Sequence, residues 1–328
     1  MGKAGVKNGF WPVLFAACVC ALPGHAITLY SADGFNVFVR QNFTGSQSDI
    51  GGSLAAGGSV QVSQYGIASG PADFTGLDSL IAGGNLNATD AEVFSGNVFV
   101  GGTTTQSGFT ILNGSLHGGA SPIDFDAAFS NLSSLSTTLA ATPANGTATS
   151  GGGITTLTGS DAVLDVFTIP ANYLNVSSFS ITAPIGAVVL ISVTCGELGD
   201  EACNAVTTIP GGVTFNGHPV NGDSTDPSVR QLLFNFSNTT SLTLSGGWLG
   251  TLLAPGADVT GGFGQFDGAL VANSFSGNTE FHDFTFTDPS VPEPTAMVLT
   301  GIGLAGIAVL GRRIRSALDN KICRRKNT

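Results

Sequence analysis

The stretch DIGGSLAAGGSVQV, residues 49–62, sets the pattern for most of the chain: a short apolar strand, a Gly-Gly corner, and a second short strand. The same shape returns in SLIAGGNLNA at 79–88 and SGNVFVGG at 95–102, with matching residues 26 and then 18 positions apart. Repeats of this length are typical of solenoids, in which each repeat forms one turn, or rung, stacked on the last. The glycines sit inside the repeated units, which favours tight corners within a rung over hairpins between strands.

The pattern returns late in the chain, in LGTLLAPGADVT at 249–260 and FDGALVANSFSG at 266–277. We therefore predict a mainly β fold, a right-handed parallel β-helix whose Val, Ile, Leu, Ala and Phe side chains stack inward. An antiparallel β-sandwich with Gly-rich hairpins is the alternative. The sequence leaves open whether the two halves form one solenoid or two domains.

One amphipathic helix is predicted in SPIDFDAAFSNLSSLSTTLAAT, residues 121–142. Ser121 is the expected N-cap, Pro122 the first helical residue, and the acidic side chains that follow oppose the helix dipole. Four apolar residues recur at spacings of four, three and four: Ala128, Leu132, Leu135 and Leu139. This stripe predicts that the helix packs along the side or over one end of the β-domain.

Residues 1–26 have the pattern of a signal peptide. Lys3 and Lys7 precede an apolar run, and Gly24 and Ala26 supply small residues for cleavage between Ala26 and Ile27. We expect export through the Sec translocon and removal of this segment by signal peptidase, leaving an ectodomain of residues 27–290.

The segment VPEPTAMVLTGIGLAGIAVLGRRIR, residues 291–315, combines three features in a fixed order. A Pro-Glu-Pro interruption precedes an apolar run, predicted as a transmembrane helix over about 295–311. A basic cluster follows and places residues 316–328 in the cytoplasm as a basic tail. These basic residues are Arg312, Arg313 and Arg315.

This order resembles the PEP-CTERM sorting signal of Gram-negative bacteria, with Val291, Pro292, Glu293 and Pro294 as the sorting motif. The resemblance implies an inner-membrane precursor that an exosortase cuts near the Pro-Glu-Pro, so that the ectodomain reaches the cell surface or the medium. The chain continues past the arginines for longer than that family usually does.

The ectodomain resembles the choice-of-anchor A family of bacterial surface domains. The resemblance is carried by FNVFVRQNFTGSQSDIGGSLAAGGSVQV, DFDAAFSNLSSLSTTLA and LLFNFSNTTSLTLSGGWLGTLLAPGADVTGGFGQFDGALVANSF, which cover its beginning, middle and end. It implies a surface location more than a chemistry, because members share the domain and differ in their anchors.

Charge and cysteine content limit which ligands the ectodomain can bind and how its cysteines are used. The chain carries a net charge of −11, and residues 27–290 contain only Arg40 and Arg230 as cations, so binding of nucleic acid or anionic lipid by charge is excluded. The exported cysteines are Cys195 and Cys203, in the loop CGELGDEAC, and a disulfide is expected between them in an oxidising compartment. A metal site would need more ligands than this loop supplies.

The sequence contains no H-E-x-x-H, G-x-S-x-G or P-loop motif. His117, His218 and His282 are far apart, and only His282 has an acidic residue at strand spacing, Glu280; we interpret it as part of a polar stretch. Asp258 and Asp267, in Gly-rich turns, are weak candidates for Ca²⁺ ligands, and no other cofactor is expected.

We therefore predict a non-catalytic surface protein that acts in adhesion or in an exopolysaccharide or biofilm matrix, through a regular face rich in Thr, Ser and Asn. The alternative is a secreted hydrolase that acts on polysaccharide from a β-helix scaffold. An ice-ordering protein with a threonine face is a third option, although the threonine spacing is irregular.

Overall fold

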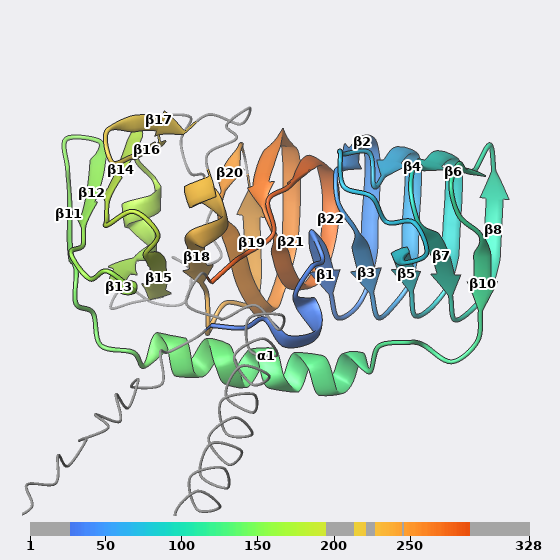
Figure 1. The fold of residues 1–328 in the computed structure, drawn as a ribbon, viewed down its shortest axis with the longest axis horizontal. Helices are drawn as coiled ribbons and strands as arrows, with labels where there is room; N and C mark the ends of the chain where they lie inside the picture. The colour runs from blue at the N-terminus through green and yellow to red at the C-terminus, as the bar shows by residue number, and fades with distance from the viewer. Residues whose placement is uncertain (1–26, 195–212, 221–226, 245, 289–328) are drawn as a thin grey trace, which may run out of the picture.

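The protein forms a parallel β-solenoid with one long helix along its side (Figure 1). The computed structural model describes residues 27–194, 213–220, 227–244 and 246–288. The solenoid has three faces, which we name A, B and C in the order in which the chain visits them within a rung.

Face A is a continuous parallel sheet that runs the full length of the solenoid. In spatial order its strands are β13 (Leu164–Pro170), β15 (Val188–Thr194), β18 (Leu232–Asn235), the first parts of β21 (Thr251–Gly268) and β22 (Leu270–Asp283), β1 (Val37–Val39), β3 (Leu54–Ala56), β5 (Asp78–Ala82), β7 (Asn97–Val100) and β10 (Leu116–Gly118). The repeat residues of the sequence are direct neighbours here: Leu54 pairs with Leu80, and Leu80 with Val98.

Faces B and C are built mainly from strands that bend from one face into the other. The strands of face B are β19 (Ser241–Leu244), β21, β22, β2 (Phe43–Ile50), β4 (Val60–Ile67), β6 (Leu86–Val93) and β8 (Thr104–Ser107). Face C contains the later parts of β21, β22, β2, β4 and β6, together with β20 (Trp248–Leu249) and β9 (Thr110–Ile111). At the bend, Gln47, Gln64 and Asp90 adopt left-handed backbone conformations with φ near +50°.

The Gly-Gly corner between faces A and B is a packing requirement. A Cβ atom at Gly83 would lie 2.4 Å from the carbonyl oxygen of Gly57, and one at Gly101 would lie 2.3 Å from that of Gly83. Only glycine lets consecutive rungs approach this closely, which explains why the sequence repeats Gly-Gly inside each unit.

The spatial order of the rungs differs from their order in the chain. The first half builds outward from β1 to β10, α1 returns along the molecule, and the second half builds back from the opposite end to β22 (Figure 1). There β22 pairs in parallel with β1 and β2, which joins the two halves into one solenoid.

Buried Asn36 lies at this junction. Its Nδ2 donates to the carbonyl oxygens of Gly268 at 2.6 Å and His282 at 2.9 Å, and its Oδ1 accepts from the amide of Gly52 at 3.1 Å. One side chain thus satisfies three backbone groups from both halves of the chain. Each such group left unpaired in the interior would cost about 1–3 kcal/mol.

Helix α1 (Phe125–Ala140) packs along the outside of face A. Ala128, Phe129, Leu132 and Leu139 are its buried apolar residues, and Phe38 of β1 stacks on Phe129 with ring centroids 5.4 Å apart. The outward apolar residues of face A complete the contact: Phe38, Ala55, Ile81, Phe99, Val166, Val188, Leu190, Leu233, Leu253 and Val271. The helix therefore covers the one face whose outer side is apolar.

At one end of the solenoid lies a second, five-stranded sheet with mixed pairing. It contains β11 (Thr147–Gly151), β12 (Ile154–Thr158), β14 (Ser178–Thr182), β16 (Val213–Phe215) and β17 (His218–Val220). The β11–β12 and β16–β17 pairs are antiparallel. Three short 3-10 helices complete the described elements: η1 (Tyr30–Ala32), η2 (Ala171–Leu174) and η4 (Pro227–Gln231).

The predicted parallel solenoid and its flanking helix are confirmed, and the open question of one or two domains is answered by the β1–β22 pairing. The β-sandwich alternative is wrong, because faces A, B and C are paired in parallel. The predicted helix start was also wrong. Asp124 is the N-cap, accepting from the amide of Ala127, while Ser121 closes a short turn with Ile123. The handedness of the solenoid remains a prediction.

Candidate functional site

Face B presents a polar surface across seven paired strands, and uncharged side chains cross it in rows. One row of outward side chains passes directly from strand to strand: Thr243, Thr260, Ser276, Thr44, Gln61, Asn87 and Thr105. A second row comprises Ser46, Ser63, Thr89 and Ser107. Because neighbouring strands lie about 4.8 Å apart, hydroxyl and amide groups repeat at that interval along the solenoid axis.

The inner side of face B keeps these rows in register. Phe43, Val60, Leu86 and Phe275 are fully or almost fully buried, and Phe43 stacks on Phe275 with centroids 5.3 Å apart. Apolar and polar residues alternate along each strand, which places one set in the core and the other in solvent. The polar face therefore rests on a packed core.

A ladder of side-chain hydrogen bonds runs along the corner between faces A and B. Asn42 Oδ1 accepts from the amide of Ser59, whose Oγ accepts from the amide of Asn85. Asn85 Oδ1 in turn accepts from the amide of Thr103 at 2.8 Å. Each rung thus satisfies a backbone donor of the next, which holds the edge of face B in a regular conformation.

An exposed phenylalanine lies at the other edge of face B, where β21 bends toward face C. Phe263 is 73% exposed and stands between Gly262 and Gly264. Phe263 was not among the site residues predicted from the sequence. An aromatic residue flanked by glycines, with no apolar partner at strand spacing, was the available signal.

Asp258 lies at the edge of face B, where neighbouring side chains donate hydrogen bonds to its carboxylate. Its Oδ1 accepts hydrogen bonds from Asn273 Nδ2 at 2.7 Å and Ser274 Oγ at 2.6 Å. Asp267 lies instead on face C and contacts His282. The two carboxylates proposed as Ca²⁺ ligands are thus on different faces. Within the described residues no group of three or more His, Cys, Asp or Glu side chains could hold a metal ion.

On face C, His282 is held between two carboxylates. Its Nδ1 lies 2.5 Å from Asp267 Oδ1 and its Nε2 lies 3.2 Å from Glu280 Oε1. The hydrogen bond to Asp267 raises the pKa of His282 to about 9, against the opposing effect of burial. Sequence spacing allowed Glu280 and His282 to share one side of the strand, and they were interpreted as a polar stretch. The contact with Asp267, from the neighbouring strand β21, was not predicted. The hydrogen bond between Asp267 and His282 cross-links β21 and β22.

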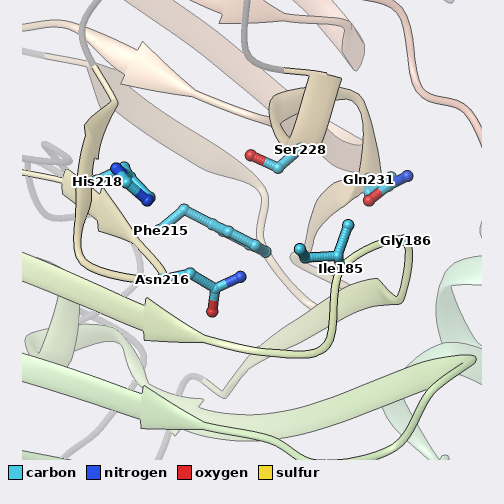
Figure 2. Close-up of a pocket in the computed structure, with 7 residues that line it drawn as sticks. All are labelled: Ile185, Gly186, Phe215, Asn216, His218, Ser228 and Gln231. Carbon is cyan, nitrogen blue, oxygen red and sulfur yellow. The ribbon is translucent and has the colours of Figure 1, made fainter.

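The other two histidines lie elsewhere. His117 is exposed and pairs with Asp78 at 2.7 Å. His218 lines a pocket of about 310 Å³ between the turn after β14, the β16–β17 hairpin and η4 (Figure 2). Its walls are Ile185, Gly186, Phe215, Asn216, His218, Ser228 and Gln231. Among the described residues, these walls offer apolar contact and hydrogen-bonding groups.

Several predicted site residues lie outside the described residues: Ala26, Cys195, Cys203, the sorting motif Val291 to Pro294, and the basic residues Arg312, Arg313 and Arg315. The predicted disulfide, cleavage sites and transmembrane segment therefore stay predictions. In the ranges that the structure describes, no helix is long and apolar enough to cross a membrane.

We predict that stability falls as pH rises between about 6.5 and 9, because of His282. The folded state raises the pKa of this side chain from 6.5 to about 9. Its contribution is therefore fully present below pH 6.5 and is lost as the pH rises through 9. Denaturant midpoints across this range measure the effect. His282→Gln should remove this pH dependence and His117→Gln should retain it; the same slope in parent and His282→Gln would refute the assignment.

Two parts of the chain match known protein families. Residues 28–283 match the family model described as "Putative Ice-binding-like adhesive domain", and residues 290–315 match the PEP-CTERM protein-sorting motif. A search of curated proteins found no match.

Two solved structures are similar at low sequence identity. One is an ice-binding protein from the Antarctic ascomycete Antarctomyces psychrotrophicus, with 15% identity, coverage of 80% of this chain and 97% of that chain, and a TM-score of 0.33. The other is an ice binding protein from an Antarctic Biological Consortium, with 14% identity, coverage of 79% and 90%, and a TM-score of 0.35. On the family match, which spans most of its length, the chain belongs to the ice-binding-like adhesive domain family.

Proposed function

We propose that this protein is an exported, non-catalytic surface adhesin whose face B binds a neutral polysaccharide of the extracellular matrix. The observation that carries the proposal is the pair of uncharged hydroxyl and amide rows that cross the strands of face B. A linear polysaccharide presents hydroxyl groups at regular intervals, and a rigid repeating face can pair with many of them at once.

The exposed ring of Phe263 adds an apolar surface beside these rows. Sugar-binding sites commonly combine such a surface with a few polar groups that fix orientation. The net charge of the chain favours a neutral polymer over a uronate, because acidic chains would be repelled by an acidic protein.

A second candidate ligand is ice, which the family description favours. Face B supplies repeating rows of uncharged hydroxyl and amide groups, as ice would require. However, Gln61 and Asn87 interrupt its threonine and serine row, and this irregularity favours a polysaccharide. The hydrolase alternative gains no support from face C, where His282 and its carboxylates hold one another.

The sorting motif supports export and processing in a Gram-negative host. In this proposal, signal peptidase removes residues 1–26 and an exosortase cuts near Pro292 to Pro294, so that residues 27–290 reach the surface or the matrix. The choice-of-anchor A assignment, the membrane segment at about 295–311 and the disulfide Cys195–Cys203 belong to the same proposal.

We predict that Phe263→Ala weakens binding to polysaccharide from the producing cells about tenfold, which corresponds to roughly 1.4 kcal/mol. The truncation removes a ring that is already exposed, so the fold should be retained. The measurement is depletion of the exported protein by the insoluble polysaccharide over a range of concentrations.

Phe94→Ala is the matched control, because Phe94 is also exposed (37%) but follows β6 on the face C side. Equal loss in both variants, or none in either, would contradict the role of face B. Thermal hysteresis of the same proteins separates the two ligands: activity that Phe263→Ala abolishes, without polysaccharide binding by the parent, would establish ice instead.

We predict that replacing Pro292, Glu293 and Pro294 with alanine blocks C-terminal processing. In a host that has an exosortase, the parent should yield a product whose intact mass places its end near Pro292 to Pro294. The triple variant should keep its C-terminal segment, residues 295–328, and stay in the membrane fraction. Pro289→Ala, just ahead of the motif, serves as the control and should be processed normally. A parent that also keeps residues 295–328 would refute this part of the proposal.

A further inference from the structure

The beginning and end of the described domain are in direct contact. The backbone nitrogen of Ile27 donates to Asp288 Oδ2 at 2.7 Å, in a buried environment. Ile27 is 4% exposed and Asp288 is 7% exposed. A buried carboxylate is stabilised by hydrogen-bond donors and by nearby positive charge, so the chemical state of the nitrogen of Ile27 matters at this contact.

The segments that carry these two residues are fixed by their surroundings. The side chains of Ile27 and Leu29 belong to the cluster between α1 and face A, and Phe286 packs against the same cluster. The amide of Leu29 donates to Asp33 Oδ1 at 2.8 Å, and that of Thr287 donates to the carbonyl oxygen of Arg230 at 2.7 Å. The contact therefore lies between two anchored segments.

Ile27 is also the residue that the predicted cleavage would make the first of the mature chain. We propose that removal of the signal peptide frees the α-amine of Ile27 and that Asp288 binds it as a buried ion pair. Hydrolysis of the Ala26–Ile27 bond consumes one water molecule. The hydroxyl ends on the carbonyl carbon of Ala26, and the nitrogen of Ile27 becomes an amine that takes up a proton.

This chemistry changes the contact from a neutral hydrogen bond into a charge-assisted one. An amide offers a single N–H, whereas an α-ammonium, with an ordinary pKa of about 8, carries a full positive charge at neutral pH. Cleavage of the signal peptide would then add a positive charge next to this carboxylate. Residues 27–290 hold only two arginines and no lysine, so this amine is a scarce cation.

Through this ion pair, removal of the signal peptide at Ile27 would stabilise the position of the segment around Asp288 at the other end of the domain. Asp288 stands just before the sorting motif that begins at residue 290. Fixing Asp288 to Ile27 holds the last segment of the domain in place at the point where any pull from the anchor would act. This inference concerns the domain's own closure and does not depend on what face B binds.

A double-mutant cycle on the exported protein tests the proposal. The first change inserts Ser-Gly between Ala26 and Ile27, so that the nitrogen of Ile27 stays an amide after cleavage. The second is Asp288→Asn. Asp288→Asn should lower the denaturant midpoint clearly in the parent and much less in the extended form, because only the parent presents a charged amine to Asp288.

Asp33→Asn is the matched control, since its partner, the amide of Leu29, is the same group in both forms. Its effect should be equal with and without the extension. A second readout is the rate at which an amine-reactive ester labels Ile27, followed by mass mapping. Asp288→Asn should speed this labelling at least about tenfold, because each unit lost from the pKa of the amine raises its neutral fraction tenfold.

Three results would overturn the proposal. Intact mass could show that the mature chain does not begin at Ile27. Asp288→Asn could cost the parent and the extended form the same stability. Labelling of Ile27 could be as fast in the parent as in Asp288→Asn.

Discussion

The pairing of β22 with β1 and β2 is the contact on which the rest of the molecule depends. Strands near the two ends of the ectodomain meet there in parallel, and Asn36 satisfies backbone groups from both halves. Without this pairing the rungs would form two short stacks. Each stack would expose the strand edges that now meet between β22 and its partners β1 and β2. Helix α1 spans both stacks on face A, and the contact of Ile27 with Asp288 adds a second link between the two ends of the domain.

The same contact gives the candidate binding face its length. Face B takes β19, β21 and β22 from the late half of the chain and β2, β4, β6 and β8 from the early half. Thr44 and Ser276 stand side by side across the junction, so the polar row is uninterrupted. Face A is covered by the helix and face C carries charged groups such as Glu280 and His282. Face B is the surface crossed by regular rows of uncharged side chains, with Asp258 at its edge.

The sequence predicted features that depend on residues close together in the chain. The spacing of 26 and 18 residues identified true rung neighbours, because a parallel rung places equivalent residues directly above one another. The apolar stripe of α1 was predictable for a similar reason, because it depends on residues three and four positions apart. The start of α1 was misplaced by a few residues because Ser121 and Asp124 are both good capping residues.

Features that depend on distant parts of the chain could not be predicted. Nothing local distinguishes β22 as the partner of β1, because its inward residues resemble those of every other rung. Asp267 and His282 meet only because β21 and β22 pair in one particular register. Phe263 was missed for a different reason, since its exposure follows from the bend between faces B and C.

Engineered cross-linking tests the junction most directly. Thr44 and Ser276 are register partners on adjacent strands, about 4.8 Å apart, which a disulfide can span. Thr44 and Thr260 are separated by one further strand, about 10 Å, which is too far. We predict that Thr44→Cys/Ser276→Cys forms an intramolecular disulfide on mild oxidation and that Thr44→Cys/Thr260→Cys does not. A failure of the first pair to cross-link, in a protein that folds, would contradict the closure of the solenoid between β22 and β2.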